Sequence, residues 1–123
     1  MITTRQFALG TLAASVMLAG QASAAEITDN EIRIGYLADM SGVYRDPIGP
    51  LGLDAIQMAV DEMGGNIQGA EIVLFSADDR NSADVGSSVV REWIDERNVD
   101  MVTGLVASSV TLASVKLLEE ENR

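Results

Sequence analysis

The sequence of 123 residues contains no cysteine and no histidine. Without cysteine there is no disulfide, no lipid-modified cysteine, and no thiolate that could act as nucleophile or metal ligand. The absence of histidine removes the commonest general base and the commonest transition-metal ligand. Serine–histidine and cysteine–histidine catalysis are therefore excluded within these residues.

Basic residues are also scarce. Eight lysine and arginine residues stand against 19 aspartate and glutamate residues, which gives a formal net charge of −11. Such a surface is poorly suited to nucleic acid or anionic lipid, so we expect no nucleic-acid partner. We favour a well-solvated exported protein over the alternative of an acidic site for a cationic partner.

The first 24 residues have the three parts of a secretory signal. The first six include Arg5 and no acidic residue, residues 7–19 are mostly apolar and small, and residues 22–24 read Ala-Ser-Ala. The alternative, a membrane-spanning helix, requires about 20 apolar residues, and this stretch is shorter and interrupted. We therefore predict a signal peptide over 1–24, cleavage after Ala24, and a soluble periplasmic protein.

Three apolar segments, 32–37, 70–76 and 101–106, are each followed by a helical pattern. Strands that alternate with amphipathic helices are typical of a parallel sheet with helical crossovers. The predicted fold class is α/β, a doubly wound parallel sheet with element order β-α-β-α-β-α. Right-handed crossovers predict the spatial strand order 2-1-3, with the first strand in the middle.

The helices are predicted from apolar spacing. In the first, Pro50 suits the first turn, Gly64 and Gly65 end the helix, and one apolar stripe is expected to lie on the sheet. That stripe comprises Ala55, Ile56, Ala59, Val60 and Met63. In the second helix we expect Asn81 to be the N-cap and the buried stripe to comprise Val85, Val89, Val90, Trp93 and Ile94. Gly35 on the first strand allows a close approach or simple packing.

Familiar catalytic motifs are absent. The sequence has no G-x-G-x-x-G, no G-K-[ST] and no G-x-S-x-G, so neither a phosphate-binding loop nor a nucleophile elbow is supported. Asp78 and Asp79 follow the second strand, and two interpretations are open for them. They could form a metal or phospho-acceptor pair, or they could hydrogen-bond to the loop and cap the next helix, which we favour.

Two segments could contact a ligand. Ser108 and Ser109 open the third helix, where hydroxyl groups and unpaired backbone amides suit a carboxylate; an ordinary serine N-cap is the alternative. In the loop 39–50, Tyr44 could pack on the apolar part of a ligand, with Asp39, Ser41 or Asp46 in polar contact, although a solvated loop explains these residues equally well. Both segments are expected at the same rim of the sheet.

Several short motifs occur in an order that resembles the start of a type I periplasmic solute-binding protein, closest to the leucine/isoleucine/valine-binding group of ABC transporters. The residues that carry the resemblance are Met40-Ser41-Gly42 with Tyr44, Gly49-Pro50, Asp54-Ala55, Ala59-Val60, Asp78 to Asn81, and the turn from Gly104 to Ser109. The resemblance implies two lobes joined by a hinge, with residues 25–123 forming a truncated, N-terminal part of lobe one.

The resemblance also implies site residues and partners. The carboxylate-holding turn of the family corresponds to Ser108 and Ser109, and its side-chain contacts correspond to Tyr44, Asp46, Pro47 and Ile48. A tyrosine at position 44 is similar to what is found in family members that bind aromatic or other small carboxylates. The implied function is non-enzymatic capture of a small carboxylate-bearing solute, such as an amino acid, for delivery to an ABC transporter permease in the inner membrane, and we expect no cofactor and no metal site. The alternative is a ligand-sensing module of a receptor or regulator.

Overall fold

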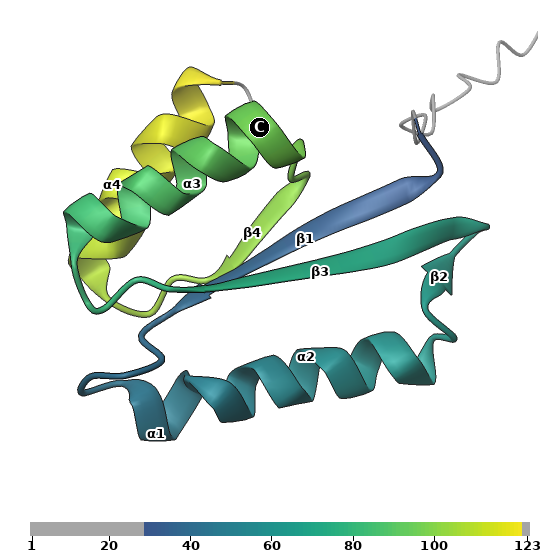
Figure 1. Cartoon of the computed structure of the whole chain (residues 1–123), viewed down its shortest axis with the longest axis horizontal. Coiled ribbons are helices and arrows are strands. Elements are labelled where there is room, and N and C mark those ends of the chain that lie inside the picture. Colours follow the sequence, from purple (N-terminus) through teal and green to yellow (C-terminus); the bar gives the residue numbers. More distant parts are fainter. Residues whose placement is uncertain (1–28, 122–123) are drawn as a thin grey trace, which may run out of the picture.

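A computed structural model describes residues 29–121, so the predicted signal peptide over 1–24 lies outside the described residues. Figure 1 shows an open sheet between two helical layers. Within this part of the chain, no helix has both the length and the apolar character needed to cross a membrane. The elements in chain order are β1 (Glu31–Ala38), α1 (Arg45–Ile48), α2 (Pro50–Glu62), β2 (Asn66–Ile67), β3 (Ala70–Asp78), α3 (Ala83–Arg97), β4 (Met101–Gly104) and α4 (Ser108–Glu120).

The sheet has the order β2-β3-β1-β4. Strand β1 runs parallel to both neighbours, and Leu37 is paired with Ala77 on one side and Gly104 on the other. The predicted order 2-1-3 and the central place of the first strand are therefore confirmed. The two-residue β2 was not predicted; it pairs antiparallel with β3 across Gln68 and Gly69, whose φ values of 52° and 91° suit a tight hairpin turn.

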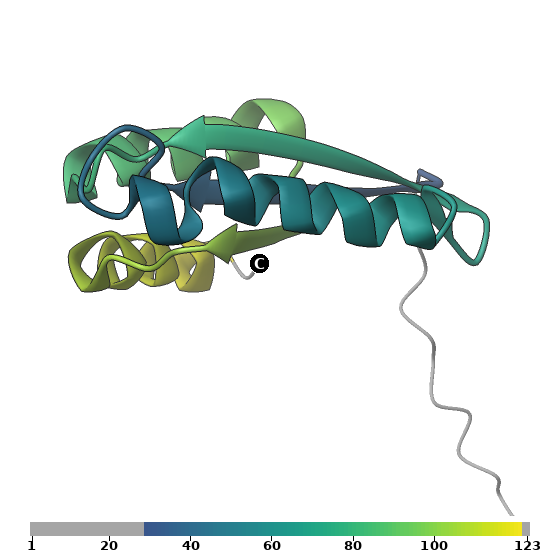
Figure 2. The same ribbon diagram turned by 90° about the horizontal axis from the view of Figure 1, so that it is seen from below.

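Helices α3 and α4 cover one face of the sheet and α2 lies on the other (Figures 1 and 2). The core lies on the α3 and α4 side, where the buried apolar side chains are Leu37, Val90, Trp93, Ile94, Val99, Ala107 and Val110. The predicted stripe of the second helix is thus largely confirmed. Gly35 serves close packing, because a Cβ there would lie 2.3 Å from Cζ3 of Trp93.

The prediction for α2 was only partly right. Its start at Pro50 and the left-handed Gly64 and Gly65 after its end agree with the sequence. Only Val60 is buried, whereas Ala55, Ala59 and Met63 are exposed. Leu51 and Met58 are 66% and 63% exposed, so apolar residues occupy more than one side of this helix. Three- and four-residue spacing alone could not select the side that meets the sheet.

The N-cap of α3 also differs from the prediction. Ser82, not Asn81, occupies this position, with φ −122° and ψ 122°, and its side chain accepts a hydrogen bond from the Val85 amide at 3.5 Å. Asn81 instead has φ 53°. An N-cap residue needs extended backbone angles, whereas asparagine tolerates the left-handed region, so the two adjacent polar residues have different roles.

Candidate functional site

The carboxyl ends of β1, β3 and β4 meet at one rim of the sheet, because the three strands are parallel. Backbone hydrogen bonds hold the segments that leave these strands together. The Asp79 amide donates to the Ala38 carbonyl at 3.0 Å, and the Leu105 amide donates to the Leu37 carbonyl at 2.9 Å. The first loop and the turn before α4 therefore leave adjacent strands, and crevices at such rims are where open α/β sheets bind ligands.

The sequence predicted one uninterrupted loop over residues 39–50. In the structure the short helix α1 lies within this segment. Tyr44 precedes α1 and is 36% exposed. Asp46 and Pro47 are exposed on α1, and Ile48 at its end is half-buried. Asp46 is also paired with the Arg45 guanidinium at 3.2 Å. Three of the four predicted loop residues are thus accessible from solvent.

Tyr36, which the sequence analysis did not single out, fixes the position of α1. This side chain is 4% exposed on β1, and its hydroxyl donates a hydrogen bond to the Ile48 carbonyl. Burial raises the pKa of Tyr36 above its usual value, so the hydroxyl stays a donor. A Cβ at Gly52 would overlap this hydroxyl, so Gly52 leaves the space in which the contact forms. No spacing pattern in the sequence marks this contact, because Tyr36 and Ile48 are twelve residues apart on different elements.

Ser108 and Ser109 are the first two residues of α4, and both are exposed. The N-cap is Ala107, with φ −72° and ψ 120°, and no side chain caps this end, so the alternative of an ordinary serine N-cap is wrong. The first amides of a helix have no acceptor within it and carry partial positive charge. Two hydroxyl groups and these amides can therefore donate hydrogen bonds to a bound anionic group.

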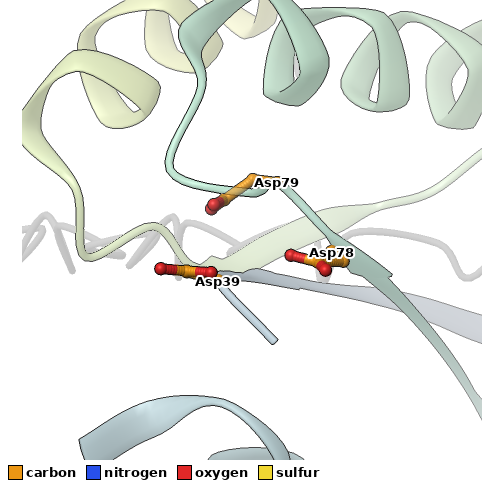
Figure 3. Close-up of side chains that lie close together, drawn as sticks. All are labelled: Asp39, Asp78 and Asp79. Atoms are coloured by element: carbon orange, nitrogen blue, oxygen red, sulfur yellow. The ribbon is translucent and has the colours of Figure 1, made fainter. Parts of the chain in front are cut away.

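Three aspartate side chains lie together at the same rim (Figure 3). Oxygen atoms of Asp39, Asp78 and Asp79 are within 4.8 Å of one another. Asp78 accepts hydrogen bonds from the Met40 amide at 3.0 Å and the Ser41 hydroxyl at 2.7 Å. The prediction that residues after the second strand hydrogen-bond to the loop is confirmed for Asp78.

The environments of these carboxyl groups differ. Burial alone would raise the pKa of Asp78, but hydrogen bonds from Ser41, Met40 and Arg80 outweigh it and lower the pKa below 3.8. Asp79 is 1% exposed and accepts one hydrogen bond, from the Asn81 amide at 2.7 Å. Burial, followed by the negative charges of Asp39 and Asp78, raises the pKa of Asp79.

Asp39 is 2% exposed, so it cannot act as the open polar contact that the sequence suggested. Its carboxylate accepts hydrogen bonds from the backbone amides of Ser41, Gly42 and Tyr44. Within residues 29–121 the three aspartates are the acidic group with the spacing of a cation site, because hard cations prefer carboxylate oxygens. Asp39 and Asp78, however, already accept hydrogen bonds from the loop, which accounts for their position without an ion.

A hollow of about 260 Å³ lies beside the first loop, lined by Arg45, Asp46, Pro50 and Leu51.

The chain was compared with models of known protein families. The model of the periplasmic binding protein family matches residues 31–123. The chain belongs to the periplasmic binding proteins. Comparison with curated proteins gave no match.

Solved structures of periplasmic binding proteins share the fold. A protein from Burkholderia mallei is 37% identical with a TM-score of 0.73, over 76% of this chain and 25% of its own. A branched chain amino acid ABC transporter periplasmic ligand-binding protein from Burkholderia xenovorans is 35% identical with a TM-score of 0.72, over 76% and 25%. An ABC transporter solute binding protein from R. palustris, in complex with benzoate, is 26% identical with a TM-score of 0.67, over 74% and 25%.

The aligned part of this chain spans about a quarter of each of these relatives, whose type I fold has two lobes. The mixed sheet with its helices corresponds to part of one lobe. In this fold both segments that the sequence suggested as ligand contacts follow the carboxyl ends of adjacent strands: the Tyr44 to Ile48 region follows β1, and Ser108 with Ser109 follows β4.

Proposed function

We propose that this protein is the substrate-binding component of an ABC transporter, which captures a small carboxylate-bearing solute, such as an amino acid, in the periplasm for import. The observation that carries the proposal is the exposed start of α4, which follows β4 at the rim where the adjacent strand β1 leads into the first loop. Ser108 and Ser109 would hold the ligand carboxylate with hydroxyl groups and backbone amides, which suit an anion without any arginine.

The remaining contacts would come from the first loop. Tyr44 would pack on the apolar part of the solute, and Asp46, Pro47 and Ile48 would shape the pocket beside it. The relatives support a carboxylate ligand: one is named for branched chain amino acids and another was solved with benzoate, and both kinds of molecule carry a carboxylate. We propose binding without chemical conversion, because the relatives are binding proteins and the sequence has no histidine or cysteine.

We further propose that residues 1–24 are a cleaved signal peptide and that residues 25–123 are the N-terminal part of lobe one. A second lobe would close over the solute, exclude water and complete the contacts that this rim supplies only in part. The closed protein would then deliver the solute to a permease in the inner membrane.

Isothermal titration calorimetry on the full-length protein tests the proposal, using a panel of amino acids and small aromatic acids together with the corresponding amides. We expect the protein to bind at least one of the acids, and not to bind the amide that corresponds to that acid. Ser108→Ala with Ser109→Ala should weaken that binding by about tenfold or more, since hydrogen bonds to a charged group contribute about 1.5–3 kcal/mol.

Ser88→Ala is the matched control, because Ser88 is an exposed helical serine on α3 whose hydroxyl donates to the Asp84 carbonyl. This variant should bind like the wild type. Silence of the wild type across the whole panel would contradict the proposed function. Equal affinity of the double serine variant and the wild type would show that the carboxylate is held elsewhere.

A further inference from the structure

The loop that carries Tyr44 is held from inside by the carboxylate of Asp39. Its Oδ1 accepts from the Gly42 amide at 2.6 Å and from the Ser41 amide at 3.3 Å, while Oδ2 accepts from the Tyr44 amide at 3.1 Å. The side chain is 2% exposed, so water does not compete freely for these bonds. Hydrogen bonds to an ionised carboxylate are the stronger kind, and here they fix three amides of one short segment.

The residues around the Asp39 carboxylate leave space for it. A Cβ at Gly42 would lie 2.6 Å from Oδ2 and 2.8 Å from Oδ1 of Asp39, so a glycine is needed where the loop passes the side chain. Asp78, at the end of β3, holds the first part of the loop through the Met40 amide and the Ser41 hydroxyl. The two strand ends therefore constrain residues 40–44 from two directions.

We propose that Asp39 is a positioning residue for ligand capture, which keeps residues 40–44 in the conformation that presents Tyr44 to the solute. The inference rests on the proposed function of the rim. A loop that is ordered before binding loses less conformational freedom when the ligand arrives, and preorganisation of this kind increases affinity. Asp39 acts through the backbone and does not touch the ligand.

The test compares Asp39→Asn with Asp79→Asn in the full-length protein. Both substitutions remove one negative charge from the same rim, but the Asp79 carboxylate accepts its hydrogen bond from the Asn81 amide and none from the first loop. An asparagine at 39 retains one oxygen acceptor and puts an NH₂ group where the other accepted, so part of the loop loses its partner. Gly42→Ala, which displaces the carboxylate without changing charge, is the second variant.

Two quantities are measured: amide hydrogen exchange of Ser41, Gly42 and Tyr44 in the unliganded protein, and the Kd for the acid that the wild type binds. In Asp39→Asn and Gly42→Ala we expect these amides to exchange about tenfold faster or more, while amides of β1 keep their protection. The Kd should rise about tenfold, equivalent to 1.4 kcal/mol. Asp79→Asn should leave both quantities near wild-type values.

Each other outcome overturns the inference. Unchanged exchange in Asp39→Asn would show that the carboxylate does not order the loop. Faster exchange with unchanged Kd would show that loop order does not serve binding. Equal weakening by Asp39→Asn and Asp79→Asn would assign the effect to rim charge. If the wild type binds no member of the panel, the proposed function fails and the inference that rests on it fails as well, whereas failure of the inference alone shows as wild-type binding together with unchanged exchange or unchanged Kd in Asp39→Asn.

Discussion

The contact between Gly35 and Trp93 predicts a large effect from the smallest possible substitution. Gly35 lies on the central strand, and Trp93 on α3 packs its six-membered ring directly over it. A Cβ at position 35 would lie 2.3 Å from Cζ3 and 2.4 Å from Cε3 of that ring. Trp93 is 4% exposed and belongs to the core, so the ring has little room to retreat.

The magnitude follows from this geometry. Favourable carbon–carbon contacts lie at about 3.5–4.0 Å, so the ring must move by roughly 1 Å inside a close-packed core. Overpacking of this kind costs about 1–3 kcal/mol. Replacing glycine by alanine recovers up to about 1 kcal/mol through the unfolded chain. For Gly35→Ala we therefore expect a net loss of about 1–2 kcal/mol, a sizeable part of a total stability of about 5–15 kcal/mol.

Urea denaturation followed by far-UV circular dichroism measures this loss, and a double-mutant cycle assigns it. Phenylalanine at position 93 lacks the outer ring, so Gly35→Ala in a Trp93→Phe background should cost less than about 1 kcal/mol. The two substitutions would then be non-additive by about 1–2 kcal/mol. If Gly35→Ala leaves stability within about 0.5 kcal/mol of the wild type, or if the two substitutions are additive, the ring does not lie over the strand.

Two further substitutions test the rim by the same denaturation assay. Tyr36→Phe leaves the Ile48 carbonyl without its donor and should destabilise the protein by about 1–3 kcal/mol; no change would show that the hydroxyl does not hold α1. Burial and the charges of Asp39 and Asp78 raise the pKa of Asp79, so the folded state binds its proton more tightly than the unfolded chain. This group therefore destabilises the wild type at neutral pH, by about 1.4 kcal/mol per unit of raised pKa, and the loss disappears below pH 3.8. Asp79→Asn should accordingly be more stable than the wild type at pH 7 and lose that advantage in acid; a difference independent of pH would contradict the shift.

The sheet could be predicted from the sequence because its strands follow strong rules. Apolar runs at Ile32, Ile72 and Met101 alternate with helical spacing, and right-handed crossovers then place the first strand between the other two. The structure confirms this order. Short elements were missed for a physical reason: α1 has four residues and β2 has two, too few for a periodic pattern to appear.

The candidate site was predictable in its location but not in its internal bonds. That loops after adjacent parallel strands meet at one rim follows from topology, which is why Tyr44 and Ser108 could be selected together. Asp39 accepts hydrogen bonds from three amides of its own loop, and Tyr36 donates to the Ile48 carbonyl, twelve residues further along the chain. Single residues of these types carry no periodic signal, so spacing alone could not assign them.

The side of α2 that faces the sheet could not be predicted from the sequence. Its sequence has apolar residues on more than one side, and Leu51 and Met58 remain exposed in residues 29–121. Hydrophobic spacing reports that a helix is amphipathic, but it selects the buried side only when the other side is clearly polar. In α3 the opposite face is charged, and there the predicted stripe with Trp93 and Ile94 was correct.

The central claim is that the start of α4 holds a solute carboxylate beside the loop after β1. A crystal structure of the full-length protein with a bound acid from the calorimetric panel tests it most directly. We expect carboxylate oxygens within hydrogen-bond distance of the amides or hydroxyls of Ser108 and Ser109, with the rest of the solute against Tyr44. A solute bound with its carboxylate away from both serines would contradict it.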